Sequence, residues 1–381
     1  MKWMIALGFL ILNFSCAGIK ELKFNQHAQN LGSHSHSNED LVPFYIENID
    51  PFYRPGSLPI GYATPYMNDE GVYFGTPTGE VKKYDYLSNR SFLITKENSA
   101  VYGRPTVQDG ILYYGTQGAE IVAYDLLKKQ ELFRTQVSAP SESSIVINQN
   151  RLFTVLRNHG LVSMDAKTGK ILWFYKRSVP TLTTLQRVAV PVIDGQKIYL
   201  GFADGFLCSL RLEDGSLQWE QKLAVPAKFQ DVDFSVVIQG KYIWASVTGQ
   251  SVKLMYLENG LIERSFEISP STNIFNLGNQ EVLVGNGFGK IYKLSSQVAD
   301  IKELILSKKP IGSLAKWKNH FLVVDFSGKV QMVRDQGGEL SLIKNKGFEM
   351  GSQWSSLLGD IEVKGDRFSL ISSRNRLYIF E

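Results

Sequence analysis

Short apolar runs separated by turn residues recur along most of the chain, and the clearest series lies at residues 190–219. Four strands are predicted in and around it, at residues 189–193, 197–200, 206–212 and 216–219. The pairs Asp194-Gly195 and Asp214-Gly215 supply the positive φ that tight turns need, and β-branched and aromatic residues fill the runs between them. One four-stranded antiparallel sheet cannot bury both of its faces, so we expect neighbouring sheets.

The same order of runs and turns is repeated along the chain. Further copies are marked by runs at residues 71–75, 110–115, 151–154, 241–244, 281–285, 320–325 and 367–372. About eight copies at a period of roughly 40 residues, with four strands in each, are typical of a β-propeller. The sequence therefore predicts an all-β fold, an eight-bladed β-propeller of four-stranded antiparallel blades that fills nearly all of the chain from residue 61 onward.

The last copy ends at Glu381 after only its third strand, residues 376–380. A closed ring needs a fourth strand there, because an open seam leaves unpaired backbone groups at a sheet edge. The run LVPFYI at residues 41–46 precedes the first full copy and has no other partner. We expect it to pair beside residues 376–380, which makes residues 41–381 one propeller domain closed by an N-terminal strand.

The N-terminus has the organisation of an export signal. Met1-Lys2 is a short basic region, and residues 3–12 form an apolar segment too short to span a bilayer as a helix. Ser15-Cys16 resembles a bacterial lipobox, in which the cysteine is lipidated and becomes the mature N-terminus. We interpret residues 1–15 as a signal peptide and polar residues 16–40 as the lipidated Cys16 and a flexible tether. An ordinary cleaved signal that happens to contain a cysteine is the alternative.

Composition argues against several classes of function. The net charge of +4 comes without a block of Lys or Arg, so nucleic-acid binding is not indicated. His34 and His36 in the tether could hold a metal but are more often simply solvated, and His159 and His320 have no partner at metal-ligand spacing. Carboxylates such as Asp85, Asp125 and Asp165 recur at turns, which indicates a structural role. Cys208, inside a strand, is expected to be a small buried hydrophobe. We therefore expect no enzyme, no cofactor and no metal site.

Two connections between copies, at residues 178–187 and 224–233, are longer than the repeat requires. The second is expected to lie two connections later along the ring. Loops that exceed what topology requires are where binding tends to lie. Leu182, Leu185 and Arg187 would display apolar and guanidinium groups, and Asp231 and Asp233 would place two carboxylates beside them on one rim. Charge-assisted bonds could hold the arginine rigidly for a partner. The alternative is ordinary loop chemistry, with both aspartates as turn caps.

The phrases at residues 168–173 and 198–201 resemble the pyrroloquinoline-quinone-type propeller repeat. That resemblance is specific for the fold and weak for function, because both enzymes and binding scaffolds use the repeat. The quinone-dependent dehydrogenases are much longer, and they carry adjacent cysteines and a calcium-ligand set that have no counterpart in this sequence.

A lipoprotein signal, a short tether and one eight-bladed propeller also resemble the BamB family of outer-membrane protein assembly factors. The phrase Asp231-Val232-Asp233, just before a strand, is similar to that family's Asp-Val-Asp motif. The resemblance implies that this loop and the Leu/Arg loop one copy earlier contact the periplasmic domains of the barrel insertase BamA.

Carried over residue by residue, Leu182 and Leu185 are implied to be apolar anchors and Arg187 an interface or loop-orienting cation, with the two aspartates as its electrostatic partners. The chain departs from the family at Val188, where a glycine is expected after the arginine.

The function expected from these features is that of a non-enzymatic scaffold lipoprotein for outer-membrane β-barrel assembly. It would be anchored in the outer membrane on the periplasmic side, with BamA and nascent outer-membrane proteins as partners. Nascent strands could be guided by β-augmentation at exposed propeller edges. Two alternatives stay open: a surface or periplasmic propeller that acts as a binding protein or adhesin, and a quinone-dependent oxidoreductase.

Overall fold

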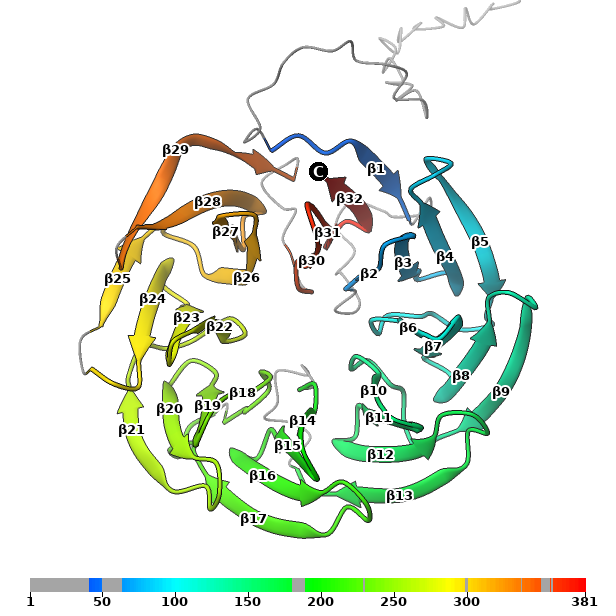
Figure 1. Cartoon of the computed structure of the whole chain (residues 1–381), viewed down its shortest axis with the longest axis horizontal. Coiled ribbons are helices and arrows are strands. Elements are labelled where there is room, and N and C mark those ends of the chain that lie inside the picture. The colour runs from blue at the N-terminus through cyan, green and yellow to red at the C-terminus, as the bar shows by residue number, and fades with distance from the viewer. Residues whose placement is uncertain are drawn as a thin grey trace, which may run out of the picture. The chain divides into compact units, whose positions relative to one another are not determined.

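The computed structural model describes residues 41–49, 64–179, 189–228, 230–298, 301–336, 338–350, 357 and 359–381. The chain divides into a unit of residues 1–35 and a unit of residues 36–381, and every described residue belongs to the second. Within that unit, eight four-stranded antiparallel sheets stand around a central axis as the blades of a propeller (Figure 1). No helix long and apolar enough to cross a membrane occurs in the part of the chain that the structure describes.

Blades 1 to 7 run in chain order from the inner strand to the outer strand at the rim, and blade 8 takes its outer strand from the N-terminal part of the chain. Blades 1 to 4 consist of β2 (Tyr66–Met67), β3 (Gly71–Gly75), β4 (Glu80–Asp85) and β5 (Arg90–Lys96); β6 (Thr106–Gln108), β7 (Ile111–Gly115), β8 (Glu120–Asp125) and β9 (Gln130–Gln136); β10 (Val146–Asn148), β11 (Arg151–Val155), β12 (Gly160–Asp165) and β13 (Ile171–Lys176); and β14 (Val192–Asp194), β15 (Lys197–Gly201), β16 (Phe206–Arg211) and β17 (Leu217–Lys222).

Blades 5 to 8 consist of β18 (Val237–Gln239), β19 (Tyr242–Val247), β20 (Ser251–Tyr256) and β21 (Ile262–Phe266); β22 (Phe275–Gly278), β23 (Glu281–Gly285), β24 (Lys290–Ser295) and β25 (Lys302–Ile305); β26 (Ile311–Trp317), β27 (His320–Asp325), β28 (Lys329–Gln336) and β29 (Glu339–Glu349); and β30 (Glu362–Lys364), β31 (Arg367–Ser372), β32 (Arg376–Phe380) and β1 (Tyr45–Asn48). The predicted eight-bladed, four-stranded architecture is confirmed.

The N-terminal strand closes the ring as expected, with shifted boundaries. β1 pairs antiparallel with β32, with Tyr45 opposite Ile379. The paired strand spans residues 45–48 rather than 41–46, and Pro43 explains the later start because it lacks an N–H to donate to the ladder. Leu41 instead packs into the apolar core between blades 7 and 8, where it is 5% exposed.

The core of the ring consists of apolar layers between neighbouring blades. Between blades 3 and 4, for example, Phe153 and Leu161 pack against Ile198, Leu200 and Cys208. Cys208 is a free thiol with no exposed surface, as the sequence predicts. Burying both faces of every blade in this way supplies the apolar contacts that an isolated four-stranded sheet lacks.

Two tryptophans on outer strands pack against the next blade of the ring. Trp173 on β13 lies against Gly215 in the third turn of blade 4, and Trp219 on β17 lies against Gly260 in the third turn of blade 5. A Cβ at either glycine would come within 2.6 Å of the indole ring. Both glycines also have positive φ, 72° and 73°. A larger residue at either position is therefore disfavoured both by its backbone conformation and by contact with the indole ring. The two indole rings therefore join blade 3 to blade 4 and blade 4 to blade 5.

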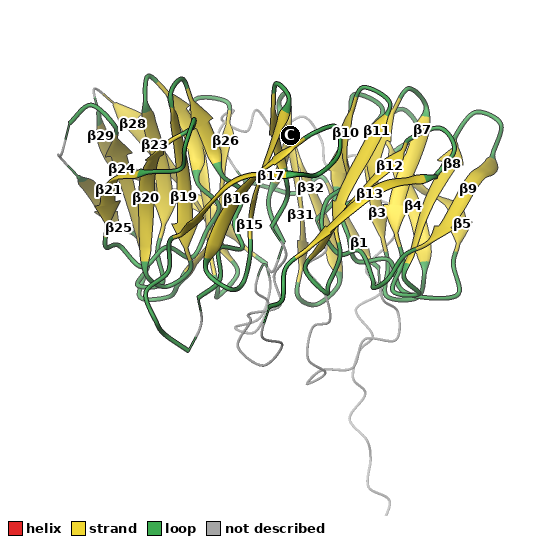
Figure 2. Ribbon diagram, turned by 90° about the horizontal axis from the view of Figure 1, so that it is seen from below, coloured by secondary structure: helices red, strands yellow, loops and turns green. Residues whose placement is uncertain are grey.

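The ring has two different faces, which Figure 2 shows edge-on. The first and third turns of each blade lie on one side, which we call the hairpin face. The second turns and the connections between blades lie on the other side, the connection face. Residues 177–191 join β13 to β14, and residues 223–236 join β17 to β18. These two long connections are therefore consecutive, rather than two connections apart as the sequence pattern suggested.

Candidate functional site

The second long connection is held against the second turns of two blades on the connection face. Its Val232 N–H donates to the carbonyl oxygen of Phe202 at 3.1 Å, and the Thr248 N–H donates to the carbonyl oxygen of Asp231 at 3.0 Å. Gly201 lets the connection approach blade 4, because a Cβ there would lie 2.1 Å from the Val232 carbonyl oxygen. The backbone of residues 231–233 is thus fixed on both sides.

The two aspartates of this connection are buried. Asp231 is 0% exposed, Asp233 is 5% exposed, and Val232 between them packs into the core shared by blades 4 and 5. The hydroxyl of Thr248, in the second turn of blade 5, donates to Asp233 Oδ1. The sequence predicted carboxylates displayed on a loop, but the structure places them inside the rim. Their effect on a partner would therefore pass through the loops they position.

Arg177 begins the first long connection and is a feature that sequence reasoning missed. Its guanidinium donates to Asp204 at 2.8 Å and to Glu220, and it lies 4.5 Å from the ring centroid of Phe206. Burial alone would lower the pKa of Arg177, but the bonds to Asp204 and Glu220 raise it above its ordinary value. A permanently charged arginine therefore ties the end of blade 3 to blade 4. A cation directly before an overlong connection was the available signal.

Leu182, Leu185 and Arg187 lie outside the described residues, as does Cys16. The grouping of Arg187 with Asp231 and Asp233, and the lipidation of Cys16, therefore stay predictions. What the structure adds is the frame on either side, with Arg177 before the first connection and the buried aspartates in the next.

Exposed apolar side chains on the connection face were also missed by the sequence reasoning. Val225 is 60% exposed. The Val225 N–H donates to Gln250 Oε1 at 3.0 Å, and Gln250 Nε2 donates to the Val225 carbonyl oxygen at 3.2 Å. Phe288 and Phe326, in the second turns of blades 6 and 7, are 69% and 42% exposed. The glycine-rich run around Phe288 is a strand-to-strand turn. Aromatic side chains on rigid turns are typical anchors in protein interfaces.

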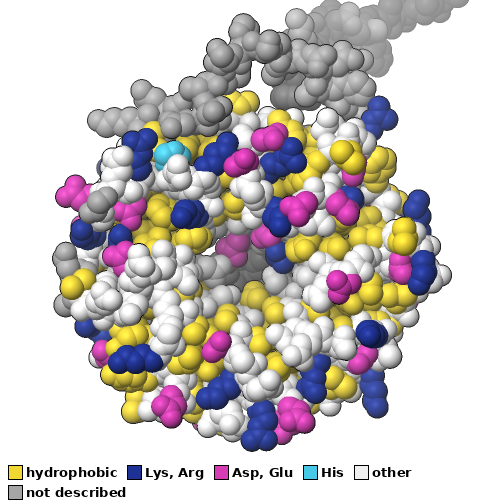
Figure 3. Space-filling model, viewed as in Figure 1, with side chains coloured by type: hydrophobic (Ala, Val, Ile, Leu, Met, Phe, Trp, Pro, Cys, Tyr) yellow, Lys and Arg dark blue, Asp and Glu magenta, His cyan; other side chains and the backbone are white. Residues whose placement is uncertain are grey.

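Charge does not single out one region of the surface. Figure 3 shows Lys and Arg mixed with Asp and Glu over one face of the ring, without a basic patch. Within the described ranges, no group of three or more His, Cys, Asp or Glu side chains is placed to hold a metal ion.

Eight four-stranded blades closed by strand β1 place the protein among the eight-bladed β-propellers. The family model described as outer membrane protein assembly factor BamB matches residues 77–297, which is more than half of the chain. The chain therefore belongs to the BamB family.

Two curated relatives are similar over part of their length. Outer membrane protein assembly factor BamB of Kangiella koreensis is 27% identical over 176 residues, which cover 44% of this chain and 45% of the relative. The protein of the same name from Shewanella oneidensis is 23% identical over 190 residues, 47% of each chain. This chain thus aligns with about half the length of these relatives.

Solved structures match over nearly the whole ring. The crystal structure of BamB from Moraxella catarrhalis has a TM-score of 0.74 at 16% identity, covering 90% of this chain and 99% of that chain. The C-terminal WD40 domain of Sif2 has a TM-score of 0.68 at 10% identity, covering 90% and 98%. At these identities the likeness shows the propeller fold alone.

Proposed function

We propose that this protein is a non-enzymatic scaffold lipoprotein of the machinery that assembles β-barrel proteins in the outer membrane. The observation that carries the proposal is membership of the BamB family over more than half of the chain. The relatives bear the name of assembly factors, and a rigid propeller ring suits a protein that holds partners in place.

In this proposal the connection face docks on the periplasmic domains of the insertase BamA. Leu182 and Leu185 are the apolar anchors, and Arg187 is the cation beside them. Asp231 and Asp233, buried in the next connection, fix the backbone that supports this loop. The arrangement lowers the ordering cost of binding, because the frame on both sides is already fixed by hydrogen bonds and an ion pair.

The location belongs to the same proposal. Lipidation of Cys16 would anchor the protein to the outer membrane on the periplasmic side. The outer strand of each blade has one free edge, at which a nascent strand could be guided by β-augmentation.

An affinity pull-down of the full-length protein from detergent-solubilised envelope, with quantitative mass spectrometry, tests the proposal. We expect BamA among the recovered proteins, and a recovery lowered roughly tenfold by Arg187→Ala or by Asp231→Ala, as for interface anchors worth about 1.4 kcal/mol or more. Circular dichroism melting must show that both variants stay folded. Arg211→Ala is the matched control, since Arg211 ends β16 next to the third turn of blade 4, on the hairpin face, and its side chain is half-exposed.

Two outcomes would contradict the proposal at different levels. Equal recovery of BamA with all variants would remove the docking site but keep the scaffold role. Failure to recover BamA with an intact, lipidated protein would remove the scaffold role itself.

A further inference from the structure

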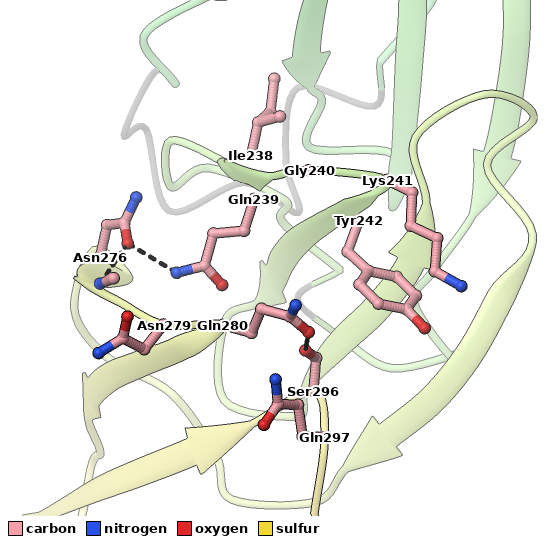
Figure 4. A pocket seen from close by; sticks show the side chains of 11 residues that line it. Ile238, Gln239, Gly240, Lys241, Tyr242, Asn276, Asn279, Gln280, Ser296 and Gln297 are labelled. Atoms are coloured by element: carbon pink, nitrogen blue, oxygen red, sulfur yellow. Dashed lines mark hydrogen bonds between the residues drawn. The ribbon is translucent and has the colours of Figure 1, made fainter.

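A polar pocket lies on the hairpin face between blades 5 and 6, opposite the connection face. Its volume is about 730 Å³, within the range of small-molecule sites. It is formed by the first turns of both blades and the third turn of blade 6 (Figure 4). Its lining residues are Ile238, Gln239, Gly240, Lys241, Tyr242, Asn276, Gly278, Asn279, Gln280, Ser296 and Gln297. Five of these eleven residues carry a side-chain amide, and none carries a carboxylate.

The pocket lies where the packing of blade on blade departs from the pattern of blades 3 and 4. At the place that Trp219 has on β17, β21 carries Arg264, which donates to the carbonyl oxygens of Ser295 and Val298 at 3.4 and 3.1 Å. The indole is found instead on the second strand of blade 5, β19, as Trp244. On β19 the indole N–H points toward the first turn of blade 5, where it orients a series of hydrogen-bonded side-chain amides.

Hydrogen bonds fix which atom each amide offers. The Trp244 indole can only donate, and it donates to Gln239 Oε1 at 3.0 Å. Gln239 Nε2 must then face the other way, and it donates to Asn276 Oδ1 at 2.6 Å, the bond drawn in Figure 4. The Gly278 N–H also donates to Asn276 Oδ1, at 2.8 Å. Both acceptor positions of this oxygen are thus used, and Asn276 is left with its Nδ2 donors.

A hydrogen bond also orients the side-chain amide of Gln280 so that its nitrogen is left as a donor. Its Oε1 accepts a hydrogen bond from the Ser296 hydroxyl at 2.8 Å, which leaves Nε2 as a donor (Figure 4). Gly278, Asn279 and Gln280 have consecutive positive φ values of 78°, 48° and 61°, so this turn is held in a conformation that non-glycine residues rarely adopt. Strained backbone of this kind is found preferentially at ligand sites.

Lys241 makes the pocket positive. Its ammonium lies 5.0 Å from the ring centroid of Tyr242 and 5.7 Å from that of Tyr256. The nearest carboxylate along the chain, Glu281, is paired with Lys293 at 3.0 Å and does not line the pocket. Lys241 also lines the smaller neighbouring pocket between blades 4 and 5, but that pocket has two carboxylates in its lining, Asp194 and Glu258.

We propose that this pocket binds an acidic saccharide, a hydroxyl-rich ring that carries a carboxylate. The donors of Asn276 and Gln280 suit the carboxylate oxygens, and Lys241, on the other side of Tyr242 (Figure 4), adds a positive charge to the lining. Asn279 and Gln297 are exposed amides that can both donate and accept, which is what neighbouring hydroxyl groups require. The proposal does not depend on the insertase as partner, because it concerns the opposite face of the ring.

Calorimetric titration of the purified protein with three probes tests the proposal. Glucuronate combines ring hydroxyls with a carboxylate, glucose has the same ring without the charge, and acetate has the charge without the ring. We expect glucuronate to bind roughly tenfold more tightly than glucose, the gain of one charge-assisted contact, and acetate to give no measurable binding.

Two variants test the residues. Asn276→Asp keeps the oxygen that accepts from Gln239 but replaces the donor by a second, charged oxygen, and Lys241→Gln removes the cation. Each should weaken glucuronate binding about tenfold or more. Lys197→Gln, at the other lysine of the neighbouring pocket, is the matched control and should leave binding unchanged.

Three results would overturn the proposal. No heat from any probe would exclude the site. Equal affinity for acetate and glucuronate would make it a simple anion site, and equal affinity for glucose and glucuronate would remove the role of the charge.

Discussion

Single glycines decide how closely neighbouring blades approach. Gly215 and Gly260 accept the indole rings of Trp173 and Trp219, and Gly169 accepts the ring of Phe133, whose Cδ2 would lie 2.4 Å from a Cβ. Each of these glycines is constrained by positive φ and by contact, and the two constraints can be separated experimentally.

Gly215→Ala is expected to lower the free energy of unfolding by about 2–4 kcal/mol, combining the cost of positive φ with overpacking against Trp173. Gly240→Ala is the matched control, because Gly240 has φ 60° and nothing within 4 Å of its Cβ position. It should cost only about 1 kcal/mol. Urea unfolding of both variants measures the difference, and equal losses would show that the indole contact contributes nothing.

The Cys208 thiol links burial to pH. Desolvation raises its pKa to about 12, above the ordinary value near 8.5, and Arg177 only partly opposes this shift. The raised pKa means that the folded state holds the proton more tightly. The stability contributed by burying the neutral thiol is therefore complete below about pH 8.5 and is lost as the pH rises toward 12.

Comparison with Cys208→Ala isolates this effect. The wild type should be the more stable protein by a constant margin between pH 6 and 8, and the margin should shrink above about pH 8.5. Thermal melting over this series is the measurement. A margin that stays constant up to pH 10 would contradict the burial of a neutral thiol.

At the scale of elements, the junction of blades 1 and 2 is packed less completely than its neighbours. Phe92 on β5 has the register position of Trp219, but Lys129 stands in the place of the docking glycine, with φ 55°. Phe92 is left 49% exposed, beside a pocket of about 670 Å³ that also includes Leu127 and Tyr124.

Lys129→Gly is expected to stabilise the protein, by up to about 1 kcal/mol, because it relieves positive φ and opens room for Phe92 to pack. Lys128→Gly, one residue earlier in the same turn and without positive φ, should instead cost about 0.5–1 kcal/mol. Opposite shifts in melting temperature would support this account, and a loss of stability in both variants would refute it.

Strand β1 gives the ring its final hydrogen-bonded ladder. Deleting residues 41–48 removes the partner of β32 along with Leu41 and the ring contact of Tyr45 with Tyr84, whose centroids are 4.1 Å apart. We expect a clear fall in melting temperature, since these contacts bury apolar area and satisfy backbone groups. Deleting residues 31–40 should change little. Similar melting of both deletions would mean that ring closure adds no stability.

At the scale of the whole molecule, the two faces should differ in partner binding. Val225→Glu and Phe288→Glu change exposed apolar residues on the connection face, and Leu87→Glu and Leu127→Glu do so on the hairpin face, where these leucines are 96% and 88% exposed. In the pull-down, the first pair should lower BamA recovery roughly tenfold and the second pair should not. The reverse pattern would move the docking surface to the hairpin face.

The sequence alone determined the repeat, the number of blades and the partner of the closing strand. Period-2 apolar runs between Asp-Gly turns are local signals, and burial on both blade faces leaves few arrangements other than a ring. The buried state of Cys208 followed from the same pattern. The repeat could be predicted because it depends on residues close in sequence or repeated at a fixed period, and the closing strand because the last copy lacks a fourth strand of its own.

Only the tertiary structure decided how the connections and junctions are used. Asp231 and Asp233 are buried, and Arg177 bridges blades 3 and 4. Trp244 orients the amides of the hairpin-face pocket. These features all depend on contacts between different blades. Such contacts are set by distances across the ring and by the directions in which side chains leave neighbouring strands. The sequence does not distinguish a loop carboxylate that faces water from one that accepts a hydrogen bond from a threonine. The burial of the carboxylate depends on the residues that pack over it.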